Sequence, residues 1–486
     1  MAQSLSTQSP SIQSLSTHLG DPAILSGLNL FGQYVNEQMT AYRADATNTL
    51  PFIDYLSSKL YSEYGIQRHI VGDLYQFYYN ITHSKFDPNN ALTQFFKSVV
   101  FRVIQDVNHE IVNMYIVALG VPQSSFEVFY PDSETPNVQE LVAGTMVMYF
   151  NGQIATRKNI GTAGFNGSRT FAELFNENNK SNGFSLDNLP ESMSKDMSYV
   201  FNVCHPDEHK YGVKGSTLVM VYNLKSEEHS LESWGQVMHS PDEFQREEAL
   251  KNHFSDMAVA LELGDVQKQL EDAGCGYIDI PKTLKFDNFG ALVRYVDAQP
   301  HTFQGVCMWM QDGSRVNYKN PAHQHVRDLA GNTCIQTQKK NESNLFFLFL
   351  RHYKMGSLDE FCRYYDQDGV YKRIFASYQI KLNNFISKLF NEYQDAHPRR
   401  KKSPHDIPFY LKDLCYSLHG VHIGSNPRVR ITPDYVRSFV LNMDNRIYGR
   451  IFTPLLEAPQ KEVVEIVEDS VEDVDSVEVP MEELAL

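Results

Sequence analysis

The pattern of apolar and polar positions changes twice along the chain. In residues 21–95 apolar side chains recur at helical spacing, starting from an aspartate and a proline in DPAILSGLNLFGQYV. Between residues 96 and 330 the pattern gives way to short β-branched and aromatic runs separated by turns, and it predicts strands in MSYVFNV, STLVMVYNL and GYIDIPK and a helix in SRTFAELFNENNK. Residues 340–457 return to apolar stripes at helical spacing. The sequence therefore predicts an α+β fold, with a strand-dominated domain between helical N-terminal and C-terminal regions.

One hairpin is indicated strongly within the strand-rich part. Residues 142–162 read VAGTMVMYFNGQIATRKNIGT, in which two strand-like runs flank Asn151-Gly152. This dipeptide favours a tight hairpin because both residues tolerate positive φ angles. The stretch is rich in Thr, Arg, Lys and Gly, as a phosphate-binding site is, but Leu141, Val142 and Ala143 stand where a nucleophile is expected. It is therefore either an active site or the shell of one.

The two ends of the chain differ in composition from the rest. Residues 1–20 form a Ser/Gln/Thr-rich lead that we expect to be disordered, without the features of a secretory signal. Residues 458–486 hold ten acidic residues and one lysine, which is −9 of the net charge of −16. This acidic tail is either a disordered solubilising segment or an arm that docks on another protein or mimics nucleic acid. Its regularly spaced Val and Ile favour docking.

The bulk composition indicates a folded intracellular protein that is not secreted. Apolar residues make up 42% of the chain, yet no apolar run approaches the length of a transmembrane helix, so no membrane partner is expected. The six cysteines are scattered without a CxxC pair, which indicates reduced thiols. Without the tail the chain is only mildly acidic, and this allows a local basic groove.

A compact basic segment interrupts the helical C-terminal region. The run HPRRKK at 397–402 brings together Arg399, Arg400, Lys401 and Lys402. Clustered cations of this kind either form a solvated loop or contact the phosphates of nucleic acid, and both interpretations stay open.

Five short blocks occur in order across the strand-rich part. They are Leu141-Val142-Ala143-Gly144-Thr145, Ala155-Thr156-Arg157, Tyr199-Val200-Phe201-Asn202-Val203-Cys204-His205-Pro206, Gln304-Gly305-Val306 and Asn317-Tyr318-Lys319-Asn320-Pro321-Ala322-His323. In order and spacing they resemble the motifs of covalent nucleotidyltransferases, which include ATP-dependent RNA ligases, DNA ligases and capping enzymes. The resemblance is closest to RNA-ligase-like proteins of large DNA viruses. It spans about residues 96–330 and, more loosely, continues to about 457.

The resemblance implies an antiparallel-sheet adenylation domain and a particular chemistry. In that family a lysine amine attacks the α-phosphate of ATP, carboxylates hold the ribose and Mg²⁺, and further lysines neutralise the phosphates. Under this alignment the chain has Leu141 for the nucleophilic lysine and Ala143 for an aspartate. The other three replacements are Asn202 and Gln304 for glutamates and Asn317 for a lysine. Leucine has no lone pair and amides carry no charge, so the sequence predicts a pseudoenzyme with no catalytic or metal-binding residue.

The motif positions that still match the family or still carry a positive charge predict a vestigial groove that binds a nucleotide or phosphate. Its expected residues are Gly144, Arg157, Lys158, Asn202, Gln304 and Lys319, and Arg169 is a further cation nearby in sequence. The plainer alternative is that these cations are solvated or paired charges at strand ends. A substitute nucleophile is the other alternative, with Lys158 and Lys210 as candidates, and only then would ATP and Mg²⁺ be cofactors.

Three functions follow as hypotheses. The first is a catalytically inactive ligase-like protein that binds RNA, DNA or a nucleotide. The second is a virion structural or interaction protein that uses the fold as a scaffold and docks another protein through its acidic tail, in the host cytoplasm or in the particle. The third is an active ATP-dependent RNA ligase with a substitute lysine. Two possible metal sets, Cys204-His205 with His209 and His301 with His323 and His325, are better explained as loop and turn residues.

Overall fold

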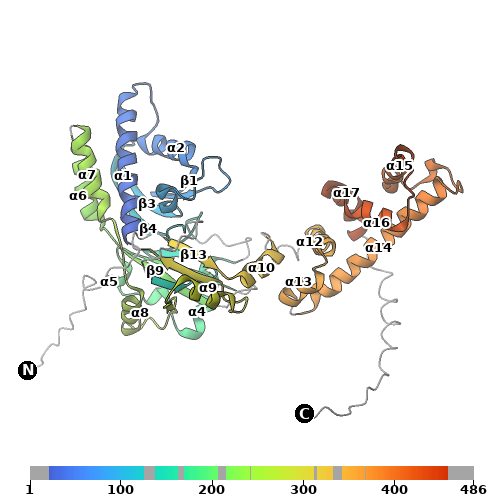
Figure 1. Cartoon of the computed structure of the whole chain (residues 1–486). Helices are drawn as coiled ribbons and strands as arrows, with labels where there is room; N and C mark the ends of the chain where they lie inside the picture. The colour runs from blue at the N-terminus through green and yellow to red at the C-terminus, as the bar shows by residue number, and fades with distance from the viewer. Residues whose placement is uncertain are drawn as a thin grey trace, which may run out of the picture. The chain divides into compact units, whose positions relative to one another are not determined.

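The computed structural model describes residues 21–124, 137–161, 169–205, 215–240, 242–310, 315–331, 342–366 and 368–457. The predicted disordered lead and the acidic tail, residues 1–20 and 458–486, lie outside the described residues. The chain divides into two compact units, residues 1–332 and residues 333–486 (Figure 1).

The first sheet of the N-terminal unit is antiparallel, with strand order β1-β2-β3-β4. Its strands are Ile66–Val71, Leu74–Tyr79, Val99–Gln105 and Ile111–Leu119, and the helices before β3 are α1 (Asp21–Ala44), α2 (Phe52–Tyr64) and α3 (Ala91–Phe95). The sequence predicted helix throughout residues 21–95, and the β1–β2 hairpin corrects this. Gly72, with φ of 62°, allows the tight turn between the β-rich runs IQRHIV and LYQFYY.

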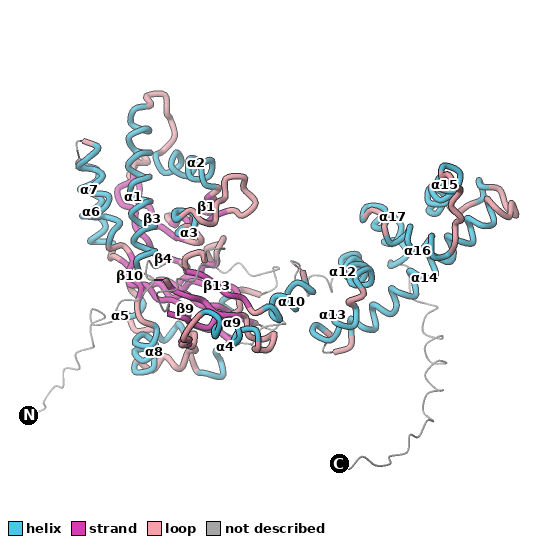
Figure 2. The backbone as a smooth tube through the Cα atoms, viewed as in Figure 1, coloured by secondary structure: helices cyan, strands magenta, loops and turns pink. Residues whose placement is uncertain are grey.

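Three helices cover this sheet and build the largest core. They are α1, α6 (Glu227–His239) and α7 (Glu243–Ser255), which lie together over β3 and β4 (Figure 2). The Phe31 ring of α1 lies 5.1 Å from the ring of Phe96 and 5.2 Å from that of Phe254 on α7. Edge-to-face aromatic contacts of this kind add to the apolar burial that fixes α1 on the sheet.

The second sheet has the order β10-β9-β8-β6-β7, and all its pairings are antiparallel. In that order the strands are Ala258–Ala260, Gly215–Leu224, Met197–Cys204, Thr145–Phe150 and Gln153–Thr156. The predicted hairpin at Asn151-Gly152 is confirmed, with φ angles of 45° and 73° at its two turn residues. The predicted strands in MSYVFNV and STLVMVYNL are β8 and β9.

The third sheet has the order β11-β5-β12-β13 and is also antiparallel. Its strands are Thr283–Leu284, Asn137–Glu140, Gly305–Trp309 and Arg315–Lys319. The sequence predicted a strand in GYIDIPK, but that run makes a single bridge, from Asp279 to Thr217. Pro281 contributes to this outcome because it has no N–H to donate to a neighbouring strand.

The remaining helices of this unit are α4 (Phe171–Asn179), α5 (Glu191–Ser194), α8 (Leu263–Asp272), α9 (Phe289–Asp297) and α10 (Pro321–Ala330). Helix α4 was predicted, and Thr170 and Glu173 form its capping box. The HQH alternation at 323–325 predicts a strand end or turn, whereas the structure places these residues in helix α10. Asn320 accepts the N–H of Ala322 at 2.8 Å and Pro321 occupies the first turn, which together start α10.

The C-terminal unit is helical, as the sequence predicted. Its helices are α12 (Glu342–Met355), α13 (Leu358–Tyr365), α14 (Val370–Ala396), α15 (Phe409–Gly424), α16 (Pro433–Leu441) and α17 (Asn445–Glu457). Phe346 of α12 anchors the packing, with ring contacts to Tyr378 of α14 and Phe452 of α17. In the part of the chain that the structure describes, no helix is long and apolar enough to cross a membrane.

Candidate functional site

The segment 141–144 connects the second and third sheets and brings three predicted blocks together. At its start the N–H of Leu141 donates to the Gly305 carbonyl at 2.9 Å, next to the pairing of Glu140 with Val306. At its end Thr145 pairs with Val203. The first, third and fourth blocks therefore meet at this junction, although they lie far apart in the sequence.

A cavity of about 450 Å³ opens at this junction. It is lined by all three residues of Leu141-Val142-Ala143, by Gln304, and by residues of the 279–282 and 299–304 segments. Its charged lining residues are Glu140, Asp279 and Lys282. A volume of this size accommodates a small ligand such as a nucleotide.

Asn202 holds the connecting segment in place. Its Nδ2 donates to the Val142 carbonyl at 2.9 Å. An ionised glutamate has no hydrogen to donate, so the acid that the family places here would not make this bond. The amide at position 202 therefore has a structural role in this chain.

Gly144 is required by a close approach of two backbones. It adopts φ of 133°, and a Cβ atom there would lie 2.8 Å from the carbonyl group of Val203. Gly305 faces the same constraint, with φ of 137° and a Cβ position 2.2 Å from the Tyr318 oxygen. Packing alone thus accounts for the glycines of the first and fourth blocks.

Two amide oxygens at predicted positions are buried without a hydrogen-bond partner in the described part of the chain. They are Gln304 Oε1, which belongs to a cavity-lining residue, and Asn317 Oδ1, in the middle of β13. Buried acceptors are normally satisfied, so each is ready to accept a hydrogen bond from a ligand or water.

The structure separates the cations that the sequence assigned to one groove. Lys319 is exposed at the end of β13, opposite Gly305 and so near the cavity. Arg157 follows β7, and its guanidinium lies 5.2 Å from the centre of the Tyr79 ring on β2. Lys158 is exposed in the turn closed by the Thr156 N–H and the Asn159 carbonyl at 2.8 Å. Neither Arg157 nor Lys158 lines the cavity.

Arg157 instead belongs to a cluster of three cations, which we call the cation cluster: Lys97, Arg157 and Arg315. Arg315, at the start of β13, donates from Nε to the Cys307 sulfur at 3.0 Å and lies 5.2 Å from the Trp309 ring. Its Nη1 donates to the Pro122 carbonyl at 3.4 Å, which places it beside the segment that follows β4.

Lys97, the third member of the cluster, lies just before β3, between Phe96 and Ser98. Both neighbours of Lys97 form backbone hydrogen bonds to other strands or their ends. The Phe96 carbonyl accepts from the Tyr79 N–H, and the Ser98 carbonyl accepts from the Gly120 N–H. Burial, followed by the charges of Arg315 and Arg157, lowers the pKa of the Lys97 amine to about 7. Among the described residues, no carboxylate forms an ion pair with any of the three cations. Within the described ranges, the cluster is therefore positively charged without a paired acid.

Sequence analysis missed Lys97, Arg315 and Lys282. Lys97 is a single polar position in the apolar run TQFFKSVVF, and Arg315 precedes the fifth block by two residues. Local sequence gives no sign that these residues meet Arg157, because strand pairing and the approach of two sheets bring them together. An isolated lysine within an apolar run was the one available signal for Lys97.

The remaining candidates of the N-terminal unit have structural partners. Arg169 forms an ion pair with Glu177, which also lies 3.3 Å from His205 Nε2. His323 Nδ1 bonds to the His301 carbonyl at 2.8 Å. Within the described ranges, no group of three or more His, Cys, Asp or Glu residues is arranged to hold a metal. His209 and Lys210 lie outside the described residues.

The basic segment of the C-terminal unit is partly neutralised by neighbouring acids. Arg399 pairs with Asp395 at 3.3 Å, and Lys402 pairs with Glu392. Arg400 and Lys401 are exposed and form no ion pair with the described residues. Contact of this segment with nucleic acid therefore stays a prediction that depends mainly on two of its four cations.

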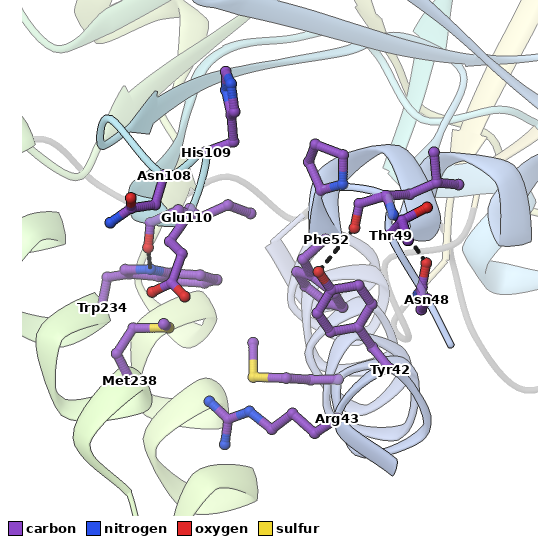
Figure 3. A pocket seen from close by; sticks show the side chains of 14 residues that line it. Tyr42, Arg43, Asn48, Thr49, Phe52, Asn108, His109, Glu110, Trp234 and Met238 are labelled. Atoms are coloured by element: carbon purple, nitrogen blue, oxygen red, sulfur yellow. Dashed lines mark hydrogen bonds between the residues drawn. The ribbon is translucent and has the colours of Figure 1, made fainter. Parts of the chain in front are cut away.

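A second cavity, of about 380 Å³, lies between α1, α6 and the turn that joins β3 to β4 (Figure 3). Trp234 donates to the Ile111 carbonyl at 3.0 Å and Tyr42 to the Leu50 carbonyl at 2.8 Å, so backbone acceptors satisfy both aromatic donors. Arg43 and Glu110 also line this cavity. None of the residues predicted from sequence does so, and this cavity is separate from the junction of the second and third sheets.

Comparison with known proteins adds no relative. No protein-family model matches the chain, and no curated protein shows significant sequence similarity to it. The family resemblance therefore stays a prediction from the five blocks, and the function is argued from the geometry of the site.

Proposed function

We propose that this chain binds the phosphates of RNA, DNA or a nucleotide without reacting with them, as an inactive relative of the nucleotidyltransferases. The observation that carries the proposal is the cation cluster. The guanidinium groups of Arg157 and Arg315 lie against the buried rings of Tyr79 and Trp309, and their charges, together with burial, lower the pKa of the Lys97 amine. Among the described residues no carboxylate forms an ion pair with these three groups. Bringing like charges together away from water is costly, and a bound phosphate would offset that cost.

The cavity at the junction of the sheets supports a second part of the same proposal. It offers nucleotide-sized space and the free acceptor of Gln304. Asn202, a further residue of the predicted groove, donates to the carbonyl of Val142, which lines the cavity, and Gly144 follows the lining residues 141–143. The polar lining of this cavity suits a base or sugar, while the cation cluster, with Arg315 at the opposite end of the β12–β13 pair, is a separate site for phosphate.

The distribution of lysines favours binding without covalent transfer. A nucleophilic lysine must lie at the nucleotide and must be neutral when it attacks. Lys282 lines the cavity but is exposed to solvent. Lys97 has a lowered pKa but is not among the cavity-lining residues. The lysine of lowered pKa therefore does not line the nucleotide-sized cavity, and the lysine that lines the cavity is solvated.

Binding of labelled oligoadenylate over a range of salt concentrations tests the proposal. When the logarithm of the affinity is plotted against the logarithm of the salt concentration, three neutralised phosphates add about 2 to the steepness of the fall. The K97Q/R157Q/R315Q variant should therefore bind more weakly, with a slope whose magnitude is smaller by about 2. The control K251Q/K268Q/K285Q makes the same change of charge at three exposed lysines of the same unit. Equal slopes in the two variants would contradict the role of the cluster, and a fall confined to R400Q/K401Q would place binding on the C-terminal unit.

An active ligase is the second candidate, and the lowered pKa of Lys97 is the observation that favours it. Incubation with radiolabelled ATP and Mg²⁺, followed by denaturing electrophoresis, tests this directly. A label that survives denaturation and is lost in K97M or K282M, but not in K285M, would overturn the non-covalent proposal. We expect no such label.

A further inference from the structure

Helix α15 of the C-terminal unit carries apolar residues on two faces. Leu411, Leu414, Cys415 and Leu418 are buried against the rest of the unit. Phe409, Tyr416 and Ile423, which we call the α15 stripe, are 92%, 42% and 59% exposed. At 100° per residue the stripe lies about 150° from the buried face. Spacing of seven residues keeps its three side chains in one line, as in a helix that packs against another segment.

The stripe also leaves room for an approaching chain. Gly420 lies between Tyr416 and Ile423 on the same side of the helix, and a Cβ atom there would meet nothing within 4 Å. An exposed line of large apolar residues beside an open glycine is unusual for a free surface and typical of a docking site.

The surroundings of the stripe are basic. The His397 ring lies 6.1 Å from Tyr416 and 4.0 Å from His419, which brings the end of α14 and the basic segment that follows it beside the stripe. Arg400 and Lys401, which form no ion pair with the described residues, belong to that segment. Over residues 342–457 the unit has 17 Lys and Arg against 12 Asp and Glu, a net charge of +5.

The acidic tail has matching chemistry. Val464, Val467, Val471 and Val474 are spaced by three, four and three residues, which is the pattern of a narrow apolar stripe on a helix, and acids fill most positions between them. The tail carries −9 against the +5 of the helical unit.

The helix that precedes the tail in the chain contacts α15. The tail follows α17, and Arg450 of α17 lies 3.5 Å from Asp413 of α15. Twenty-nine residues span up to roughly 95 Å when extended, far more than is needed to reach a neighbouring helix. Docking within one chain also has the advantage of a high effective concentration.

We propose that the acidic tail, residues 458–486, docks on the α15 stripe of its own chain. The valines at 464, 467, 471 and 474 cover Phe409, Tyr416 and Ile423. The flanking carboxylates meet Arg400, Lys401 and the other cations around the stripe. The tail thereby shields an apolar surface that would otherwise promote self-association.

Hydroxyl-radical footprinting of the full chain tests this contact at the level of side chains. We expect oxidation of Phe409 and Tyr416 to rise several-fold when the chain is truncated after Glu457, and to be independent of protein concentration. Phe244, which is 75% exposed in the other unit, serves as the reference and should not change. The V464S/V467S/V471S/V474S variant should behave like the truncated chain. The matched control V463S/I466S/V477S/V479S replaces the same number of apolar residues at tail positions outside the set 464, 467, 471 and 474. This control should behave like the native chain.

Each other outcome overturns the proposal in a distinct way. Equal oxidation of the α15 stripe with and without the tail means that the tail does not cover it. Low oxidation that persists after truncation means that another part of the chain is the cover. Protection that grows with protein concentration means that a second copy is the occupant. Circular dichroism of each variant shows that the helices are intact, which separates loss of docking from loss of folding.

Discussion

The side chain of Asn202 donates a hydrogen bond to the carbonyl of Val142 at 2.9 Å, and this bond ties β8 to the segment that crosses from the third sheet to the second. Position 202 is where the family resemblance places a metal-binding or ribose-binding glutamate. The donor on the amide, rather than the missing charge, is therefore the property that this fold uses.

Replacing Asn202 with aspartate should destabilise the protein by about 1–3 kcal/mol at neutral pH, because the ionised carboxylate cannot donate to the Val142 carbonyl. The loss should shrink at a pH low enough to protonate the carboxyl, which regains a donor. Urea unfolding at both pH values measures this. N188D makes the same change at an exposed amide and should cost little at either pH.

Replacing Gly144 with alanine should cost about 2–4 kcal/mol, because the new Cβ would meet the Val203 backbone in a conformation that side chains rarely adopt. The control is G235A in α6, where a Cβ meets nothing within 4 Å and helix propensity predicts a gain of about 0.5–1 kcal/mol. Thermal and urea unfolding compare the two. Equal stability of both variants would contradict the close approach.

Binding of oligoadenylate should weaken as pH rises above about 7. The free Lys97 amine has its pKa lowered to about 7, and a bound phosphate favours the charged form, so binding above this pH must take up a proton. The dissociation constant should rise by up to about tenfold per pH unit between pH 7 and 8.5. Adenylate phosphodiesters do not titrate in this range. The K97M variant should show a flatter profile, and identical profiles would exclude Lys97 from the site.

His253 should make the fold sensitive to acid. Burial lowers its pKa from 6.5 to about 4, and its ring bonds to the Met114 carbonyl and the Ser233 hydroxyl, both at 2.8 Å. Between these two pKa values the unfolded chain binds a proton that the folded chain does not, so stability falls as pH drops from 6.5 toward 4. The slope from this group is up to about 1.4 kcal/mol per pH unit.

The H253Q variant should lose this part of the pH dependence, whereas H239Q, at an exposed histidine, should keep it. Urea unfolding across the acid range compares the two with the native chain. A difference between H253Q and the native chain that does not vary with pH would contradict the assignment.

Much of the local structure was determined by the sequence alone. Asn151-Gly152 predicted its hairpin, the β-branched runs predicted β8 and β9, and periodic apolar positions predicted the helical C-terminal unit, because each depends on neighbours within a few residues. The hairpin at Gly72 and the start of α10 at Asn320-Pro321 also had local signals, but these were read as helix and as a strand end or turn.

Only the tertiary structure decided which side chains share a site. Leu141, Asn202 and Gln304 converge because two sheets meet at residues 141–144, and Lys97 joins Arg157 and Arg315 because strands from all three sheets approach one another. These relationships rest on contacts between residues 60 to 172 positions apart in the chain, for which no single stretch carries a signal. The sequence thus determined most of the local elements, whereas their packing decided that Asn202 serves as a donor and Arg157 as part of a cation cluster.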